Sequence, residues 1–288
     1  MVTKKSPARK KASATKAALR GVAYRPTPDM VAQANLKNWE AVARKANRDL
    51  EGFWEAEARE LEWYKPWKKV LDSSKAPFYK WFTGSRVNIV HNAIDRHLKT
   101  HRKNKLALIW ESEDGKEERS YSYYKLSREV SRMASIIKSM GVHKGDRVTI
   151  YMGRIPEAVF AMLACAKIGA VHSVVFGGFS VDALQGRIED SESKLLITCD
   201  GSYQNGKRIE LKQIADAALQ RCPSVQNVLV VQRTGQEVNM QPERDHWYHE
   251  LLETPVAQDR MATELLEAED PLFILFTSGS TGRPKAIL

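Results

Sequence analysis

The 288-residue chain has few cysteines and no long uninterrupted apolar run. No CxxC pair occurs, which excludes a disulfide framework and a cysteine-based zinc module and favours a reducing cytoplasm. The most apolar stretch, residues 159–176, contains a lysine, a glycine and a histidine, so we do not expect a membrane span. No apolar segment follows the basic N-terminus, so we expect no signal peptide. The three cysteines are far apart: Cys165, Cys199 and Cys222.

Acidic residues are absent from the first 20 positions, which hold seven lysines and arginines. Since the chain has 45 basic and 35 acidic residues, the remainder has 38 basic against 35 acidic and is nearly balanced. Residues 1–22 also lack large apolar groups apart from Leu19, so we expect a disordered basic arm. No nucleic-acid-binding fold accompanies this arm, and we therefore favour an incidental or solubilising extension over a nucleic-acid partner.

Residues 23–100 are rich in tryptophan and helix signals. Thr27, Pro28 and Asp29 combine a capping hydroxyl, a proline for the first turn and an acid, which predicts a helix start. Five of the seven tryptophans lie in this segment, and we expect it to pack on a neighbouring domain. These are Trp39, Trp54, Trp63, Trp67 and Trp81.

From residue 101 onward, apolar strands alternate with amphipathic helices. Asp114-Gly115 predicts a hairpin turn, and Ser122 predicts the cap of a helix that ends before Gly141. The alternation predicts βαβ units and an α/β fold with a mainly parallel, doubly wound sheet. Residues 233–269 are polar, and we expect an irregular excursion. Strands are expected at 147–152, 171–176, 194–199, 227–231 and 272–276, and further helices at 156–168, 181–190 and 209–221.

The last expected strand runs directly into a loop rich in glycine and hydroxyl groups. Two glycines let the backbone amides turn into one concavity, hydroxyls add donors, and a lysine supplies positive charge, which together predict a phosphate site. The spacing differs from the G-x-x-x-x-G-K-[ST] pattern of the P-loop. A plain Ser/Gly turn is the alternative, but the preceding strand and the lysine favour phosphate. The loop reads Thr277-Ser278-Gly279-Ser280-Thr281-Gly282-Arg283-Pro284-Lys285.

This string resembles the signature phosphate loop of the adenylate-forming, AMP-forming acyl-CoA synthetase superfamily. Residues 81–97 and residues 172–188, which contain His-Ser-Val-Val-Phe-Gly-Gly-Phe-Ser, are similar to the acetyl-CoA synthetase subfamily. The resemblance covers residues 24–288. It implies the large α/β domain of adenylate-forming enzymes, incomplete over residues 101–288 and preceded by a helical segment over residues 23–100.

The resemblance implies an acetate–CoA ligase that forms acetyl-adenylate and diphosphate from ATP and acetate, then acetyl-CoA and AMP from CoA. The phosphate loop would surround the β- and γ-phosphates of ATP and share their charge with Mg²⁺. No metal ligand and no certain catalytic residue is expected within this chain, apart from phosphate stabilisation by Lys285. The implied ATP-phosphate residues are Thr277, Ser278, Gly279, Ser280, Thr281, Gly282 and Lys285.

The resemblance also implies a CoA site, formed in part by the turn Phe176-Gly177-Gly178. An ordinary strand-to-helix turn, in which glycine only supplies the backbone conformation, is the alternative. Gln204 stands where the family usually carries an arginine near the CoA phosphates, and a neutral amide does not replace a guanidinium. Lys207 or Arg208 would compensate, or both are ordinary surface charges.

Two further departures lie beside the phosphate loop. Phe276 stands where tyrosine is common, and Ala286 stands where glycine is usual, so a positive φ there would be strained.

Other polar residues favour structural roles. Asp95, Arg96 and His97 are consecutive, so their side chains diverge and we expect no catalytic triad. His172 on an apolar strand and Cys165 on an apolar helix are expected in the core.

The family is about twice this length, and its acyl pocket, adenine contacts and C-terminal domain are not found here. We therefore expect an N-terminal fragment that is inactive alone and needs its missing C-terminal half. Small-molecule partners would be acetate, ATP and CoA. Alternatives are a propionate or other short-chain acyl-CoA synthetase, or a truncated, non-catalytic nucleotide- or partner-binding protein.

Overall fold

The computed structural model describes residues 25–277 and 284–288, so the expected arm over residues 1–22 lies outside the described part. The chain divides into two compact units, residues 1–54 and 55–288. The first unit contains α1 (Pro28–Gln33), α2 (Trp39–Arg48) and the start of α3 (Leu50–Ala58). The Thr27 hydroxyl accepts a hydrogen bond from the amide of Met30 at 3.3 Å, which confirms the predicted helix start. That these helices pack on a neighbouring domain stays a prediction.

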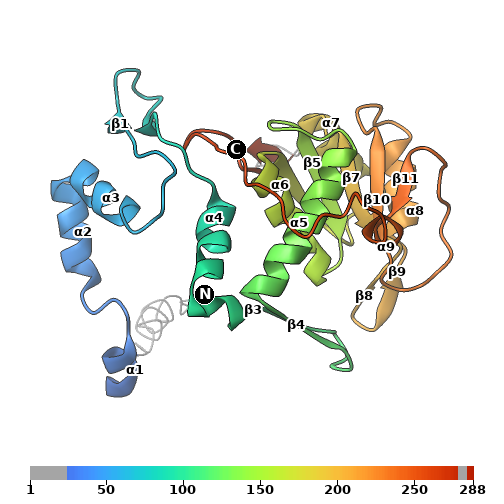
Figure 1. Ribbon diagram of the computed structural model, residues 1–288, viewed down its shortest axis with the longest axis horizontal. Coiled ribbons are helices and arrows are strands. Elements are labelled where there is room, and N and C mark those ends of the chain that lie inside the picture. The colour runs from blue at the N-terminus through green and yellow to red at the C-terminus, as the bar shows by residue number, and fades with distance from the viewer. Residues whose placement is uncertain (1–24, 278–283) are drawn as a thin grey trace, which may run out of the picture. The chain divides into compact units, whose positions relative to one another are not determined.

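The second unit is built around a seven-stranded sheet with the order β11-β10-β7-β5-β6-β12-β13 (Figure 1). All neighbouring strands are parallel except β12 and β13, which are antiparallel. The predicted α/β class with a mainly parallel sheet is confirmed. The strands are β5 (Arg147–Met152), β6 (Val171–Phe176), β7 (Leu195–Cys199), β10 (Asn227–Val231), β11 (Asp245–Trp247), β12 (Phe273–Thr277) and β13 (Lys285–Ile287).

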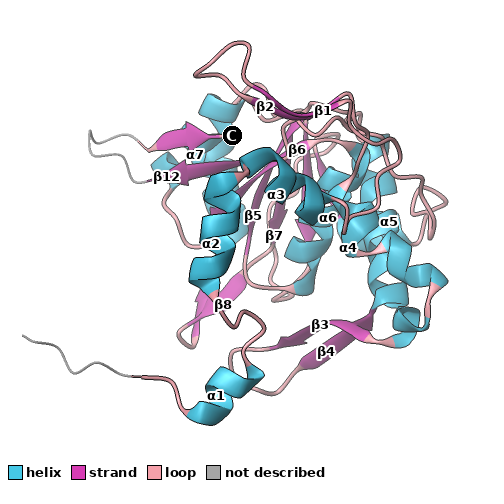
Figure 2. Ribbon diagram, turned by 90° about the vertical axis from the view of Figure 1, so that its left-hand side faces the viewer, coloured by secondary structure: helices cyan, strands magenta, loops and turns pink. Residues whose placement is uncertain are grey.

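Helices lie on both faces of this sheet, as a doubly wound fold requires. Figure 2 shows α7 on one side of β5 and β7, and α5 with α6 on the other. Ser122 caps α5, as the sequence predicted, and Gly169 closes α6 at φ 74°. The helices are α5 (Tyr123–Ser139), α6 (Pro156–Ile168), α7 (Val181–Ser191), α8 (Leu211–Leu219) and the short α9 (Tyr248–Leu252).

Three hairpins flank the sheet, and only one was predicted. The strands β3 (Leu106–Glu111) and β4 (Glu118–Ser122) form the predicted hairpin around Asp114-Gly115. β1 (Lys69–Asp72) pairs with β2 (Lys80–Thr83) inside the segment expected to be helical. That segment also holds α4 (Ile89–Ala93) and the 3₁₀ helices Asp95–Lys99 and His101–Asn104.

The third hairpin joins β8 (Ser202–Gln204) to β9 (Lys207–Ile209). Asn205 and Gly206 turn the chain with φ of 53° and 70°, which is the Asn-Gly turn that favours a two-residue hairpin. The helix expected from residue 209 therefore begins at Leu211.

The core lies between the helical layers and the central strands. Every residue of β7 and all but the first of β5 are buried. The second half of β6 differs, since Val174 and Phe176 are 42% and 40% exposed. The prediction that residues 171–176 are buried on both faces is therefore wrong there, because no described element covers that face of β6. None of the described helices combines the length and apolar character that a membrane crossing needs.

Candidate nucleotide site at the carboxyl edge of the sheet

Six parallel strands end at one edge of the sheet, and the loops that follow β5, β6, β7 and β10 leave from there. The chain continues from β5 through α6 to β6, which pairs with one edge of β5. The other neighbour of β5 is β7, from which the chain continues through α8 to β10, farther from β5. The connections therefore diverge between the carboxyl ends of β5 and β7, which is where open α/β sheets place their ligands.

A cavity of about 350 Å³ lies at this edge. Its walls come from the loop after β5, the turn after β6, the β8–β9 hairpin and the β3–β4 hairpin. Arg233, from the loop after β10, completes the lining. The lining residues are Trp110, Glu111, Glu113, Met152, Gly153, Arg154, Ile155, Phe176, Gly177, Ser202, Tyr203, Gln204, Asn205 and Arg233.

Glycines allow the loops to approach one another at this edge. A Cβ at Gly177 would lie 2.4 Å from the carbonyl oxygen of Met152, at the end of the neighbouring strand. A Cβ at Gly153 would lie 2.0 Å from the hydroxyl of Ser202. Since both distances are below any real Cβ contact, only glycine fits at these two positions without a shift of the loops.

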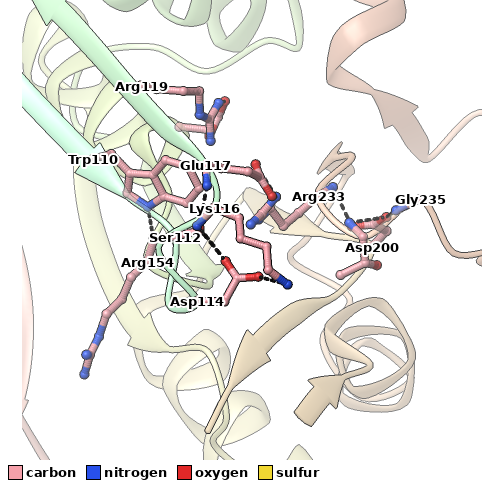
Figure 3. Close-up of polar contacts among 12 residues, drawn as sticks. Trp110, Ser112, Asp114, Lys116, Glu117, Arg119, Arg154, Asp200, Arg233 and Gly235 are labelled. Atoms are coloured by element: carbon pink, nitrogen blue, oxygen red, sulfur yellow. Dashed lines mark hydrogen bonds and ion pairs between the residues drawn. The ribbon is translucent and has the colours of Figure 1, made fainter. Parts of the chain in front are cut away.

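Asp200, which follows β7, anchors the back of the site. Its buried carboxylate accepts hydrogen bonds from the amides of Gly201 and Arg233, both at 2.7 Å, and of Gly235 at 2.6 Å (Figure 3). The amide of Thr234 also donates to it at 3.0 Å. These bonds tie the loop after β10 to the loop after β7, and this attachment holds the Arg233 side chain at the cavity wall.

Trp110 of β3 forms a second junction. Its indole Nε1 donates to the carbonyl of Arg154 at 2.6 Å, while the guanidinium groups of Arg119 and Arg233 lie 4.6 and 5.2 Å from its ring centroid. Arg119 bonds Glu157 at 2.5 Å. Burial alone would lower the pKa of Arg119, but the hydrogen bond and charge of Glu157 outweigh it and raise the pKa. These contacts attach the β3–β4 hairpin to the edge of the sheet.

The residues expected to bind CoA are only partly brought together. Phe176, Gly177 and Gln204 line the cavity, and a Cβ at Gly178 would lie 3.0 Å from Oε1 of Gln204. Lys207 and Arg208 are exposed on β9 and do not line the cavity.

Sequence reasoning missed Trp110, Arg154 and Arg233. Arg154 had a usable signal, since it lies two residues after a predicted strand, at the ligand-binding edge. Trp110 and Arg233 reach the site from distant parts of the chain.

The expected phosphate loop is bracketed by two described strands. Thr277 ends β12 and pairs with Lys285 at the start of β13. The side chain of Lys285 is exposed. The residues from Ser278 to Gly282 lie outside the described part of the chain, so their phosphate role stays a prediction. Ala286 is paired with Phe276 in extended backbone, so the strain considered for a positive φ does not arise.

The remaining predictions about polar residues can be compared with their contacts. Asp95 pairs with buried Lys167 at 3.1 Å, Arg96 donates to the carbonyl of Glu60 at 3.2 Å, and the His97 ring packs edge-on against a tyrosine ring. The three side chains diverge, as expected. Among the described residues, no three His, Cys, Asp or Glu side chains gather in a way that would hold a metal ion.

His172 and Cys165 are buried, as the sequence predicted. Burial lowers the pKa of His172 to about 4, so its ring is neutral near pH 7.

Two family models match consecutive parts of the chain. Residues 94–288 match the AMP-binding enzyme family, and residues 39–93 match the acetyl-coenzyme A synthetase N-terminus. The chain is 50% identical over 256 residues to acetyl-coenzyme A synthetase 2 of Pseudomonas putida, covering 88% of this chain and 39% of that protein. It is 49% identical over 271 residues to the acetyl-coenzyme A synthetase of Wolinella succinogenes, covering 92% and 41%.

A solved structure supports the same fold. Acetoacetyl-CoA synthetase from Streptomyces lividans matches with a TM-score of 0.78 and 27% identity, over 89% of this chain and 39% of that one. The chain therefore spans about 40% of the length of the relatives it matches.

Proposed function

The chain belongs to the AMP-binding enzyme family, and on this premise we propose that it is the N-terminal part of an acetate–CoA ligase. The reaction converts ATP, acetate and CoA into acetyl-CoA, AMP and diphosphate by way of acetyl-adenylate. The observation that carries the proposal is the carboxyl edge of the sheet. A cavity that depends on glycines lies there at the ends of β5 and β6, and β12, the neighbour of β6, leads into the hydroxyl-rich loop. The names and high identity of the acetyl-CoA synthetase relatives support acetate.

The loop between β12 and β13 would hold the β- and γ-phosphates of ATP. Thr277 and Lys285 face each other across the ladder that closes this loop, which places a hydroxyl and an ammonium group at its base. Their role would be electrostatic: they would stabilise the charge that builds on the departing diphosphate as the carboxylate attacks the α-phosphorus. Mg²⁺ would share that charge when bound to the phosphates.

The cavity after β5, β6 and β7 would take CoA. Gly177 lets the backbone of the turn pack against β5 without a side chain in the way, and Phe176 and Tyr203 offer aromatic surface to a nucleotide base. The polar groups of Ser202 and Gln204 face the same space.

The finer assignments rest on the resemblance. A short-chain substrate other than acetate, such as propionate, is the alternative. We expect cytoplasmic activity because the three thiols are free. We also expect residues 1–288 alone to be inactive, since they match about 40% of the length of full acetyl-CoA synthetases.

A chimera tests the proposal. Residues 1–288 would replace the matched part of the Pseudomonas putida enzyme, and acetate-dependent exchange of diphosphate into ATP would be measured. We expect exchange by the chimera, little exchange by residues 1–288 alone, and at least a tenfold loss for Lys285→Ala at unchanged thermal stability. A folded chimera that binds ATP without exchange, with acetate or with propionate, would favour the non-catalytic nucleotide-binding alternative.

A further inference from the structure

The CoA cavity is nearly balanced in charge, with two glutamates and two arginines in its lining. A ligand phosphate needs a cation that is not already neutralised by the protein. Arg233 does not meet this requirement, because its Nη1 lies 2.9 and 3.0 Å from the two carboxylate oxygens of Glu117. Its guanidinium also packs on the rings of Trp110 and Tyr203, so its position is fixed from three sides.

Arg154 is held differently. Its carbonyl accepts the bond from Trp110 Nε1 at 2.6 Å, which fixes the backbone at the end of β5. Its exposed guanidinium lies 5.8 Å from the ring centroid of Phe176 and forms no hydrogen bond or ion pair within the described part of the chain. Figure 3 shows the side chain extending away from Trp110 and from the Glu117–Arg233 pair. A free guanidinium is thus held at the cavity rim beside an aromatic ring.

The wall formed by the β8–β9 hairpin has no cationic side chain among its described lining residues. The β8–β9 hairpin presents only neutral groups to the cavity, namely the side chains of Ser202, Tyr203, Gln204 and Asn205. Lys207 and Arg208, the two residues expected to supply charge there, lie on exposed β9 outside the lining.

We propose that Arg154 binds a phosphate of the nucleotide half of CoA and supplies the charge that Gln204 does not. This inference rests on the assignment of CoA to the cavity. The planar guanidinium matches two phosphate oxygens, and its position over Phe176 reduces the rotamer freedom that binding would otherwise remove. Arg154 acts as a binding residue and takes no part in bond making or breaking.

The test uses residues 1–288 and measures the affinity for CoA and for dephospho-CoA by calorimetry. The variants are Arg154→Gln, the double variant Arg154→Gln with Gln204→Arg, and the matched control Arg102→Gln on an exposed 3₁₀ helix away from the cavity. Thermal melting of each variant checks that the fold is intact.

We expect Arg154→Gln to weaken CoA about tenfold, the loss of one charge-assisted contact, and to reduce the salt dependence of binding. Arg102→Gln should bind as the wild type does, and the double variant should recover affinity. A smaller loss with dephospho-CoA would assign the contact to the 3′-phosphate, and an equal loss would assign it to the diphosphate.

Two failures are distinguishable. If the wild-type chain binds CoA and folded Arg154→Gln binds it equally well, or if the double variant recovers nothing, the role of Arg154 is wrong while the CoA site stands. If the wild-type chain does not bind CoA at millimolar concentration, the assignment of CoA to the cavity fails and the inference falls with it.

Discussion

Replacement of Gly177 by alanine tests whether backbone contact at the carboxyl edge depends on glycine. The added Cβ would lie 2.4 Å from the carbonyl oxygen and 2.7 Å from the carbonyl carbon of Met152, where real Cβ contacts stay above 3.0 Å. Both atoms are backbone at the end of a buried strand, so no side chain can rotate away. The turn or β5 must therefore shift, and such overpacking costs about 1–3 kcal/mol. For a unit of this size, about 2 kcal/mol lowers the melting temperature by roughly 4–8 °C.

Gly186→Ala is the matched control. This glycine lies within α7, and a Cβ there would meet nothing within 4 Å. Because alanine favours a helix interior over glycine, the control should stabilise the chain by about 0.5–1 kcal/mol. The assay is urea denaturation of both variants followed by circular dichroism, with CoA affinity as a second readout. A Gly177→Ala variant as stable as the wild type, with unchanged CoA affinity, would refute the close approach of these loops.

Three further predictions concern groups outside the cavity. Lys212→Met should lower the free energy of unfolding by about 3 kcal/mol. The Nζ of buried Lys212 lies 2.8 Å from the fully buried carboxylate of Asp245, and the substitution removes one of the cations that neutralise this carboxylate. A loss below 1 kcal/mol in urea titrations would contradict the prediction. Burial lowers the pKa of His172 to about 4, so as the pH falls the imidazole takes up a proton in the unfolded chain before it does so in the folded chain. The contribution of His172 to the free energy of unfolding should be complete above pH 6.5 and decrease by up to about 3 kcal/mol toward pH 4. The free energy of unfolding of His172→Gln should no longer depend on pH in this range, and an unchanged pH dependence would contradict the role of His172. Burial raises the pKa of the thiols of Cys165 and Cys199 to about 12 and that of Cys222 to about 11. A disulfide reagent at pH 8 should therefore modify none of the three in the native chain and all three after denaturation. Rapid labelling of the native chain would contradict the burial of these thiols.

Local signals were enough to predict the central sheet. The expected strands form at residues 147–152, 171–176 and 227–231. Each is a short apolar run bounded by a glycine or proline and a helix, too short for a buried helix, and such a run favours a strand. β11 was missed because Asp245 and His246 give it no apolar pattern; its pairing with β10 and the bonds of Asp245 to Lys212 and Arg244 hold it in place. Such stabilisation is tertiary and leaves no local signal.

The candidate site was likewise predictable only in part from the sequence. Phe176 and Gly177 could be identified because Phe176 ends a predicted strand and Gly177 directly follows it. Trp110 and Arg233 could not, because they lie more than 100 residues apart and meet in the folded chain, where Arg233 packs on the Trp110 ring and pairs with Glu117 of the same hairpin. The hairpin that carries Gln204 was overlooked although its Asn-Gly turn was visible in the sequence.

Hydrogen exchange of the chain with and without CoA tests the central claim most directly. We expect CoA to slow amide exchange in the segments after β5, β6 and β7, which are residues 152–155, 176–178 and 202–205. The exposed basic residues 99–105, which lie outside this edge, should exchange as before and serve as an internal control. Protection confined to residues 99–105, with none in the three segments, would contradict the placement of the nucleotide site at the carboxyl edge of the sheet.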